Sequence, residues 1–105
     1  MPTSTKVSLE QLSDETLIHR VARGEPTALE ILYERHAAMI LGICLKIIGD
    51  QVEAESILQE TFWQIWRGTT SYKAERGSFQ AWLFKLARNL ALDVYRQRSS
   101  KLDRK

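Results

Sequence analysis

One predicted helix near the end of the chain gathers side chains that are suited to binding single-stranded nucleic acid. Helical residues follow one another at about 100°, so Trp82, Lys85, Asn89, Asp93 and Arg96 share one face of that helix. The indole ring offers a plane for base stacking, the amide can donate to and accept from base edges, and the cations can pair with phosphates. With the preceding loop and helix neighbours added, the candidate nucleic-acid-binding residues are Tyr72, Lys73, Arg76, Trp82, Lys85, Leu86, Arg88, Asn89, Asp93 and Arg96.

The same side chains also fit purely structural roles. Trp82 fits a half-buried packing residue, and Asp93 fits a helix-surface pair with Arg96 or Gln97. The basic end of the helix fits a solvated face that complements the negative end of the helix dipole. Spacing alone does not decide between these interpretations and nucleic-acid binding.

A second polar face lies on the preceding helix and consists of Glu53, Ser56, Gln59, Glu60 and Trp63. A tryptophan beside glutamine and carboxylates suits docking to another protein, because aromatic anchors dominate interface energetics. The pattern also fits a solvated acidic face with Trp63 packed against a neighbouring helix, and the spacing slightly favours this second interpretation.

Amphipathic helices are predicted to position these faces. Apolar spacing and terminating glycines place the helices at 14–23, 26–48, 50–67 and 79–97, with a polar loop at 69–78. Asp50 and Ser78 are expected N-caps, and the second helix is expected to be central because it is apolar on more than one face. Residues 14–98 are therefore predicted to form an all-α bundle of about four helices, between a flexible segment at 1–13 and a fraying polar tail at 99–105. The core stripe predicted for the last helix is Phe79, Leu83, Leu86, Leu90 and Val94.

Length and composition limit the possible function classes. At 105 residues the chain is one small domain. Its single cysteine excludes an internal disulfide, His19 and His36 lack the spacing of a zinc site, and no glycine-rich phosphate loop or nucleophile motif is present. We therefore expect no enzyme, no metal and no cofactor. The longest apolar stretch has about 12 residues, whereas a bilayer needs about 20, and residues 1–13 lack a signal-peptide core, so we expect a cytoplasmic protein without membrane insertion.

The net charge of +2 conceals two segments of opposite sign. Residues 50–66 carry four acidic side chains and no Lys or Arg, whereas residues 85–105 carry seven basic and two acidic side chains. Eight of the nine aromatic residues lie between Phe62 and Tyr95. This dipolar, aromatic second half is where we expect partners to bind.

The two helices with these faces resemble region 2 of bacterial RNA polymerase sigma factors of the extracytoplasmic-function group. The stretch GDQVEAESILQETFWQIW follows the acidic DAEDLxQExFxxW pattern of that family, with matches at Gln59, Glu60, Phe62 and Trp66. The stretch YKAERGSFQAWLFKLARNLALDVYRQR follows FxxWLxxIARNxxxDxxR, with matches at Phe79, Trp82, Leu83, Ala87, Arg88, Asn89, Asp93 and Arg96. The upstream stretch LIHRVARGEPTALEILYERHAAMILGICLKIIGD is similar to the opening helices of the family, so the resemblance covers about residues 14–98.

The resemblance implies promoter recognition during transcription initiation, without catalysis. It implies that the acidic helix docks on the coiled coil of the polymerase β′ subunit through Glu53, Gln59, Glu60 and Trp63, and that Ser56 departs from an acidic family position. It implies that the loop with Tyr72, Lys73 and Arg76 holds an extruded base of the non-template −10 strand, with Lys85 and Asn89 on the helix side. It leaves open whether Trp82, Arg88 and Asp93 contact DNA or support the fold, and it implies that Arg96 lies near phosphate.

The resemblance also implies further partners and a second domain. Factors of this kind are commonly held by an anti-sigma factor, and we expect the isolated chain to be a monomer. We expect the family's region 4 helix-turn-helix, which reads the −35 element, to be absent from this chain. We therefore expect an isolated or truncated first domain that binds −10 DNA weakly and initiates transcription poorly alone.

Two other function classes stay open on the residues themselves. The first is a helix-turn-helix regulator that reads duplex DNA, although the ten-residue loop and the concentration of aromatic residues speak against it. The second is a helical interaction adaptor that does not bind nucleic acid.

Overall fold

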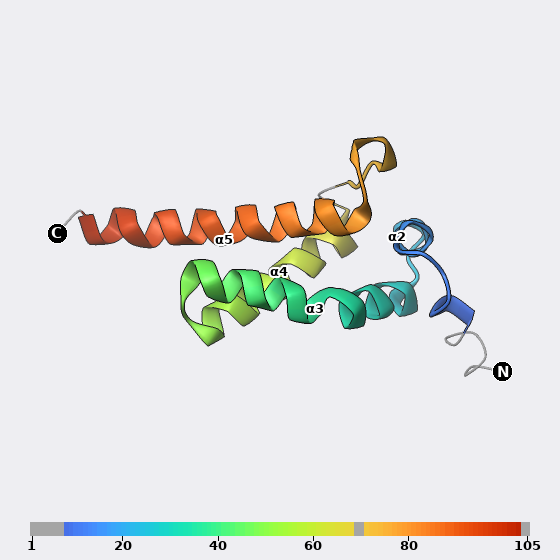
Figure 1. Ribbon diagram of the computed structural model, residues 1–105, viewed down its shortest axis with the longest axis horizontal. Helices are drawn as coiled ribbons and strands as arrows, with labels where there is room; N and C mark the ends of the chain where they lie inside the picture. Colours follow the sequence, from blue (N-terminus) through green and yellow to red (C-terminus); the bar gives the residue numbers. More distant parts are fainter. Residues whose placement is uncertain (1–7, 69–70, 104–105) are drawn as a thin grey trace.

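The computed structural model describes residues 8–68 and 71–103, with side chains described through residue 100. Its elements, in chain order, are α2 (Asp14–Ala22), α3 (Pro26–Ile48), α4 (Gln51–Arg67), the 3₁₀ turn η1 (Ala74–Arg76) and α5 (Phe79–Asp103). No strand occurs within these ranges. The predicted all-α bundle of about four helices is therefore confirmed. Figure 1 shows α5 lying along α3, with α4 crossing behind this pair and packing on both, and with α2 at the opposite end of the bundle from the C-terminus.

The helix ends follow from local side-chain and backbone chemistry. Ser13 Oγ accepts a hydrogen bond from the Thr16 N–H at 3.1 Å, and Asp50 Oδ1 accepts one from the Glu53 N–H at 2.9 Å. Each bond satisfies a backbone donor that has no partner inside its own helix. At the C-terminal end of α3, Gly49 takes a left-handed φ of 74°, which glycine adopts without the steric cost of a Cβ. The predicted N-cap at Asp50 is confirmed.

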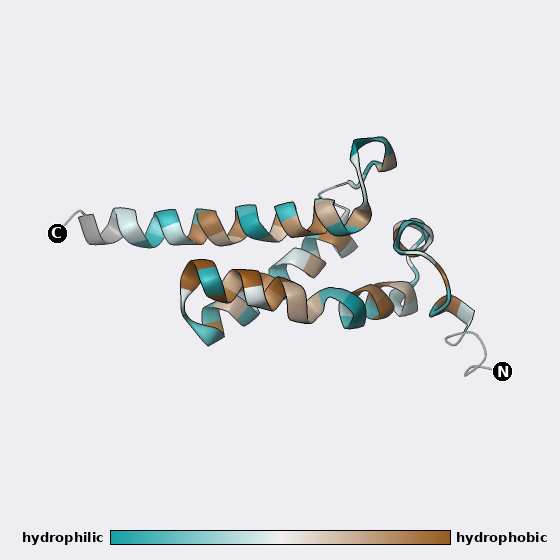
Figure 2. Ribbon diagram, in the orientation of Figure 1, coloured by the Kyte–Doolittle hydropathy of each residue, from teal (hydrophilic) through white to brown (hydrophobic). Residues whose placement is uncertain are grey.

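The core forms around α3, which packs against α2, α4 and α5, as its many-sided apolar character predicted. Leu17 of α2, Leu32 and Ile40 of α3, and Phe79 and Leu83 of α5 are completely buried. Figure 2 shows hydrophobic residues concentrated along α3, while hydrophilic residues recur along α5. Burial of these large side chains is the main favourable term that holds the small bundle together.

The buried face of α5 differs in part from the predicted stripe. Phe79 and Leu83 are fully buried as expected, but Leu86, Leu90 and Val94 are only partly buried. The fully buried positions further along α5 are instead Ala87 and Ala91. Small side chains let helix backbones approach closely, so α5 packs on the bundle with the alanines buried and the longer side chains partly exposed.

Both ends of the predicted domain extend further than expected. Leu9 lies in the core with 5% exposure, and the Glu10 carbonyl accepts a 2.7 Å hydrogen bond from Arg35 of α3. At the other end, α5 continues to Asp103, beyond the expected end near 97, and Arg98 donates both to the Ile48 carbonyl (3.3 Å) and to the Glu53 carboxylate (2.8 Å). Residues 1–7 of the expected flexible segment and residues 104–105 of the expected tail lie outside the described residues.

Within the part of the chain that the structure describes, no helix has the length and apolarity needed to cross a membrane.

Candidate nucleic-acid interface and docking surface

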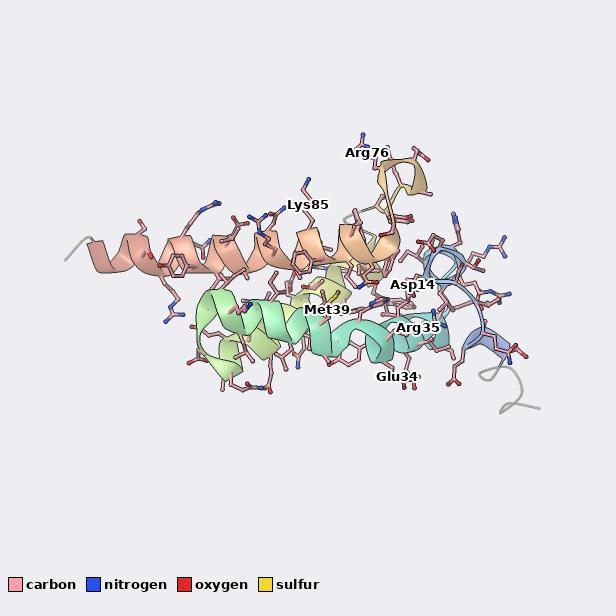
Figure 3. All side chains as sticks on the ribbon, viewed as in Figure 1. Asp14, Glu34, Arg35, Met39, Arg76 and Lys85 are labelled. Carbon is pink, nitrogen blue, oxygen red and sulfur yellow. The ribbon has the colours of Figure 1, made fainter. Side chains whose placement is uncertain are left out.

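A groove with a volume of about 390 Å³ runs between the loop before α5 and the first turns of α5. Its lining residues are Ser71, Lys73, Arg76, Ala81, Trp82, Lys85, Leu86 and Asn89. Six of the ten predicted nucleic-acid-binding residues therefore meet in one hollow, and we call this hollow the strand groove. Figure 3 shows the side chains of Arg76 and Lys85 extending from the same side of the molecule, away from the helix bundle.

The loop wall of the strand groove is shaped by a tight turn. Residues Ala74–Arg76 form the turn η1, and Gly77 follows with a φ of 125°, a conformation that L-residues rarely adopt. Ser78 Oγ then accepts a hydrogen bond from the Ala81 N–H at 3.1 Å, which confirms the predicted cap of α5. This turn places Arg76 beside the first turns of the helix.

Tyr72 lies outside the strand groove, although it was predicted to bind nucleic acid. Its ring makes edge-to-face contacts with Phe79 (5.7 Å between centroids) and Trp82 (5.8 Å), and its hydroxyl donates to the Gly77 carbonyl at 2.7 Å. Burial raises the pKa of the Tyr72 hydroxyl, and the charges of nearby Glu15 and Glu75 raise it further. Tyr72 is therefore placed to hold the loop against α5.

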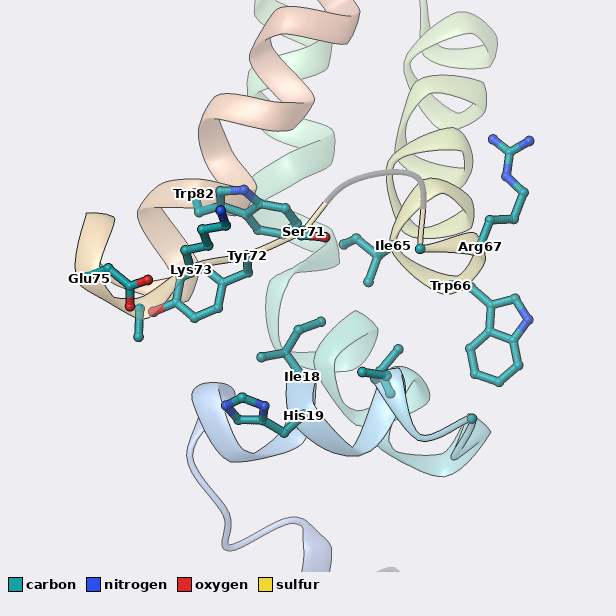
Figure 4. Close-up of a pocket in the computed structure, with 15 residues that line it drawn as sticks. Ile18, His19, Ile65, Trp66, Arg67, Ser71, Tyr72, Lys73, Glu75 and Trp82 are labelled. Carbon is teal, nitrogen blue, oxygen red and sulfur yellow. The ribbon is translucent and has the colours of Figure 1, made fainter.

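Trp82 stands between two hollows. It lines the strand groove, and it also lines a larger cavity of about 620 Å³ between the loop, α2 and the end of α4. Figure 4 shows Trp82 and Tyr72 together at this cavity, with Ile18 and His19 of α2 facing them. Trp82 is half-buried against Phe79 at 5.6 Å between centroids, so part of its indole packs while part faces the strand groove.

The remaining predicted residues follow α5 beyond the strand groove. Arg88, Asp93 and Arg96 are all exposed. Asp93 and Arg96 form an ion pair at 3.6 Å, which is the alternative that the spacing left open. A pair as exposed as this contributes little to stability, so Arg96 exchanges partners easily.

The predicted docking face of α4 is exposed at Ser56, Gln59, Glu60 and Trp63. Trp63 is 51% exposed, Arg67 stacks over its ring at 5.3 Å, and Arg67 also pairs with Glu60 at 3.0 Å. Glu53 differs from the other four, because it is half-buried and its carboxylate pairs with Arg98 of α5 at 2.8 Å.

An apolar groove of about 320 Å³ adjoins Trp63, between α3 and α4. Its lining residues are Pro26, Leu29, Tyr33, Gln59, Phe62, Trp63 and Trp66. The sequence did not predict the α3 side of this groove, because Leu29 and Tyr33 share the helical spacing of the apolar residues that were assigned to the core. The one available signal was the aromatic residue Tyr33, which is 39% exposed in the structure and whose ring contacts Phe62 edge-on.

Comparison with known proteins supports the resemblance found in the sequence. Residues 32–101 match the family model for sigma-70 region 2, so the chain belongs to this family. It is 31% identical over 80 residues to the ECF RNA polymerase sigma factor SigK of Mycobacterium ulcerans, a match that covers 76% of this chain and 43% of SigK. It is 31% identical over 83 residues to the RNA polymerase sigma-H factor of Pseudomonas aeruginosa (79% of this chain, 42% of that factor). It is 33% identical over 75 residues to the ECF RNA polymerase sigma factor SigL of Mycobacterium tuberculosis (71% and 42%).

The matches thus span less than half the length of these relatives. The resemblance to region 2 of extracytoplasmic-function sigma factors is confirmed as a family assignment. Sigma factors are transcription initiation factors.

Proposed function

We propose that this chain recognises promoters by capturing the melted non-template strand of the −10 element while it is docked on the β′ subunit of RNA polymerase. The observation that carries the proposal is the strand groove, which brings Lys73 and Arg76 of the loop together with Trp82, Lys85 and Asn89 of α5. These residues combine the stacking, hydrogen-bonding and charged groups that single-stranded nucleic acid requires.

Each part of the strand groove has a defined task in this proposal. The cations Lys73, Arg76 and Lys85 follow the phosphates, the exposed part of the Trp82 indole stacks on a base, and the Asn89 amide reads a base edge. Extrusion of a base costs a few kcal/mol in lost stacking, so the contacts in the groove must recover that amount. Arg88 and Arg96, which are exposed further along α5, would continue the phosphate track.

Docking on the polymerase is assigned to the exposed face of α4, which is acidic where the strand groove is basic. Gln59, Glu60 and Trp63 are exposed on α4, within a segment that carries no Lys or Arg from 50 to 66. The adjoining apolar groove would accept an apolar side chain of the partner, with Trp63 as the anchor at its edge. An anti-sigma factor that covered either surface would block one of the two contacts, and we include such an inhibitor among the proposed partners.

The DNA-binding half of the proposal is tested by base discrimination. Strands that bind the chain together with core polymerase are selected, and the affinities of Asn89→Ala and Lys85→Ala for the selected and mismatched strands are compared at one salt concentration. Asn89→Ala should reduce the discrimination at one position by about tenfold, because a good base contact is worth about 1–3 kcal/mol. Lys85→Ala should weaken all strands alike. Unchanged discrimination in Asn89→Ala would show that α5 does not read bases at this position.

The docking half is tested by affinity for core polymerase. Trp63→Ala is compared with Tyr95→Ala, because Tyr95 is an equally exposed aromatic residue on α5 (50% against 51%). Trp63→Ala should weaken polymerase binding by at least about tenfold, in the range of an interface hot spot. Tyr95→Ala should bind as the unmodified chain does. Equal affinity of both variants would remove the apolar groove from the interface.

A further inference from the structure

A carboxylate from the other end of the sequence reaches the loop that walls the strand groove. Glu15 lies in the first turn of α2, and its Oε2 accepts a hydrogen bond from the Phe79 backbone N–H at 3.0 Å. Phe79 is the first residue of α5, so its N–H has no acceptor within its own helix. The start of α5 therefore has two caps, the neighbouring Ser78 and the distant Glu15, and the charge of Glu15 complements the positive end of the helix dipole.

The same carboxylate acts on the beginning of the loop. Glu15 lies close enough to Tyr72 that, after burial, its charge is the next largest contribution to the raised pKa of the Tyr72 hydroxyl. Tyr72 in turn donates to the Gly77 carbonyl at 2.7 Å and contacts Phe79 and Trp82. Glu15 therefore lies near Tyr72 at one end of the loop and binds the Phe79 N–H at the other end, and Lys73 and Arg76 lie between these two points.

The neighbouring residue Asp14 anchors the first turn of α2, which carries Glu15, to α3. Asp14 accepts from His36 at 2.9 Å and from Arg35 at 3.0 Å, both on α3. His36 is buried, and its ring lies 5.8 Å from that of Phe79. The first turn of α2 is therefore fixed to the central helix by one carboxylate, while the other carboxylate extends to the loop and to α5.

We propose that Glu15 is a positioning residue for promoter binding, which sets the loop at 71–78 so that Lys73 and Arg76 face Trp82 and Asn89 across the strand groove. The inference rests on the proposed function and deepens it. Glu15 touches no DNA in this account, and it acts through the geometry of the loop.

The test compares two substitutions of Glu15 in the full chain bound to core polymerase. Glu15→Ala removes the acceptor, whereas the amide oxygen of Glu15→Gln can still accept from the Phe79 N–H. Glu15→Ala should lower the affinity for the selected strand by at least about tenfold, as expected for a hydrogen bond to a charged group, with Glu15→Gln recovering most of the loss. Affinity for core polymerase should be unchanged in both variants. Glu25→Ala is the matched control, because it removes an ion-paired carboxylate (with Arg20, 3.3 Å) without touching the loop.

Amide hydrogen exchange of the free chain separates this proposal from the proposed function. Glu15→Ala should speed exchange at Phe79 and through 71–78, and should leave the centres of α3 and α4 protected. If the unmodified chain showed no strand preference, the proposed function would fail, and loop exchange alone would then decide the role of Glu15. Unchanged exchange in the loop, or equal losses of strand and polymerase affinity in Glu15→Ala, would overturn the positioning role.

Discussion

Removing one cation from the strand groove should change the salt dependence of strand binding by a calculable amount. Three cations line the groove, namely Lys73, Arg76 and Lys85. Each phosphate contact on a single strand contributes about −0.7 to the slope of log affinity against log salt, so the groove accounts for about −2.1. Lys85→Ala should make the overall slope less steep by about 0.7. Between about 50 and about 200 mM salt, the affinity defect of this variant should therefore shrink by about 2.6-fold.

The assay is fluorescence anisotropy of a labelled single strand titrated with the chain bound to core polymerase, repeated across that salt range. Lys46→Ala is the matched control, because Lys46 is an exposed lysine on α3 and does not line the strand groove. It makes the same change in net charge without removing a groove contact. The reasoning would be refuted if Lys85→Ala kept the full slope, or if Lys46→Ala changed the slope by the same amount.

Two further predictions concern the bundle that positions the groove. Phe79→Ala should lower the free energy of unfolding by about 3–5 kcal/mol in urea denaturation, because Phe79 is completely buried, whereas Phe84→Ala, at 38% exposure, should cost much less. Burial raises the pKa of the Cys44 thiol above its ordinary 9.0, so the folded state holds this proton more tightly than the unfolded state. The contribution of the protonated Cys44 thiol to folding stability is present below the ordinary pKa. It is lost as the pH rises through the raised pKa of the folded state. Comparison with Cys44→Ala, which cannot titrate, should show the extra loss of stability in the unmodified chain under alkaline conditions.

Local chemistry made much of the fold predictable from the sequence. The caps at Asp50 and Ser78 and the stop at Gly49 depend only on residues within one turn of the helix end, so spacing and residue type were enough to place them. Trp82, Lys85 and Asn89 of the strand groove share one face of α5 because helical spacing alone places them there. Their meeting with Lys73 and Arg76 in one groove needed the structure, and their binding of DNA remains a prediction.

Contacts between distant segments were not predictable in the same way. Phe79 and Glu15 are 64 residues apart, and no periodicity relates a carboxylate in α2 to the backbone of α5. The continuation of α5 past residue 97 involves Arg98, whose two acceptors lie at the end of α3 and on α4. The packing of the Tyr72 ring on Phe79 was likewise not predictable from spacing, and DNA binding by Tyr72 stays a prediction. In each case a partner distant in the sequence decides where the side chain lies.

The central claim is that the strand groove holds the non-template strand, and site-specific photocrosslinking tests it most directly. A benzophenone amino acid is placed at Ala81, an exposed residue that lines the groove, or at Val52 on α4, which is 72% exposed and outside it. With core polymerase and promoter DNA, the probe at position 81 should crosslink to the non-template strand within the −10 element, and the probe at position 52 to polymerase alone. Crosslinking from position 81 to the template strand or to polymerase only, or equal DNA crosslinking from both positions, would contradict the account.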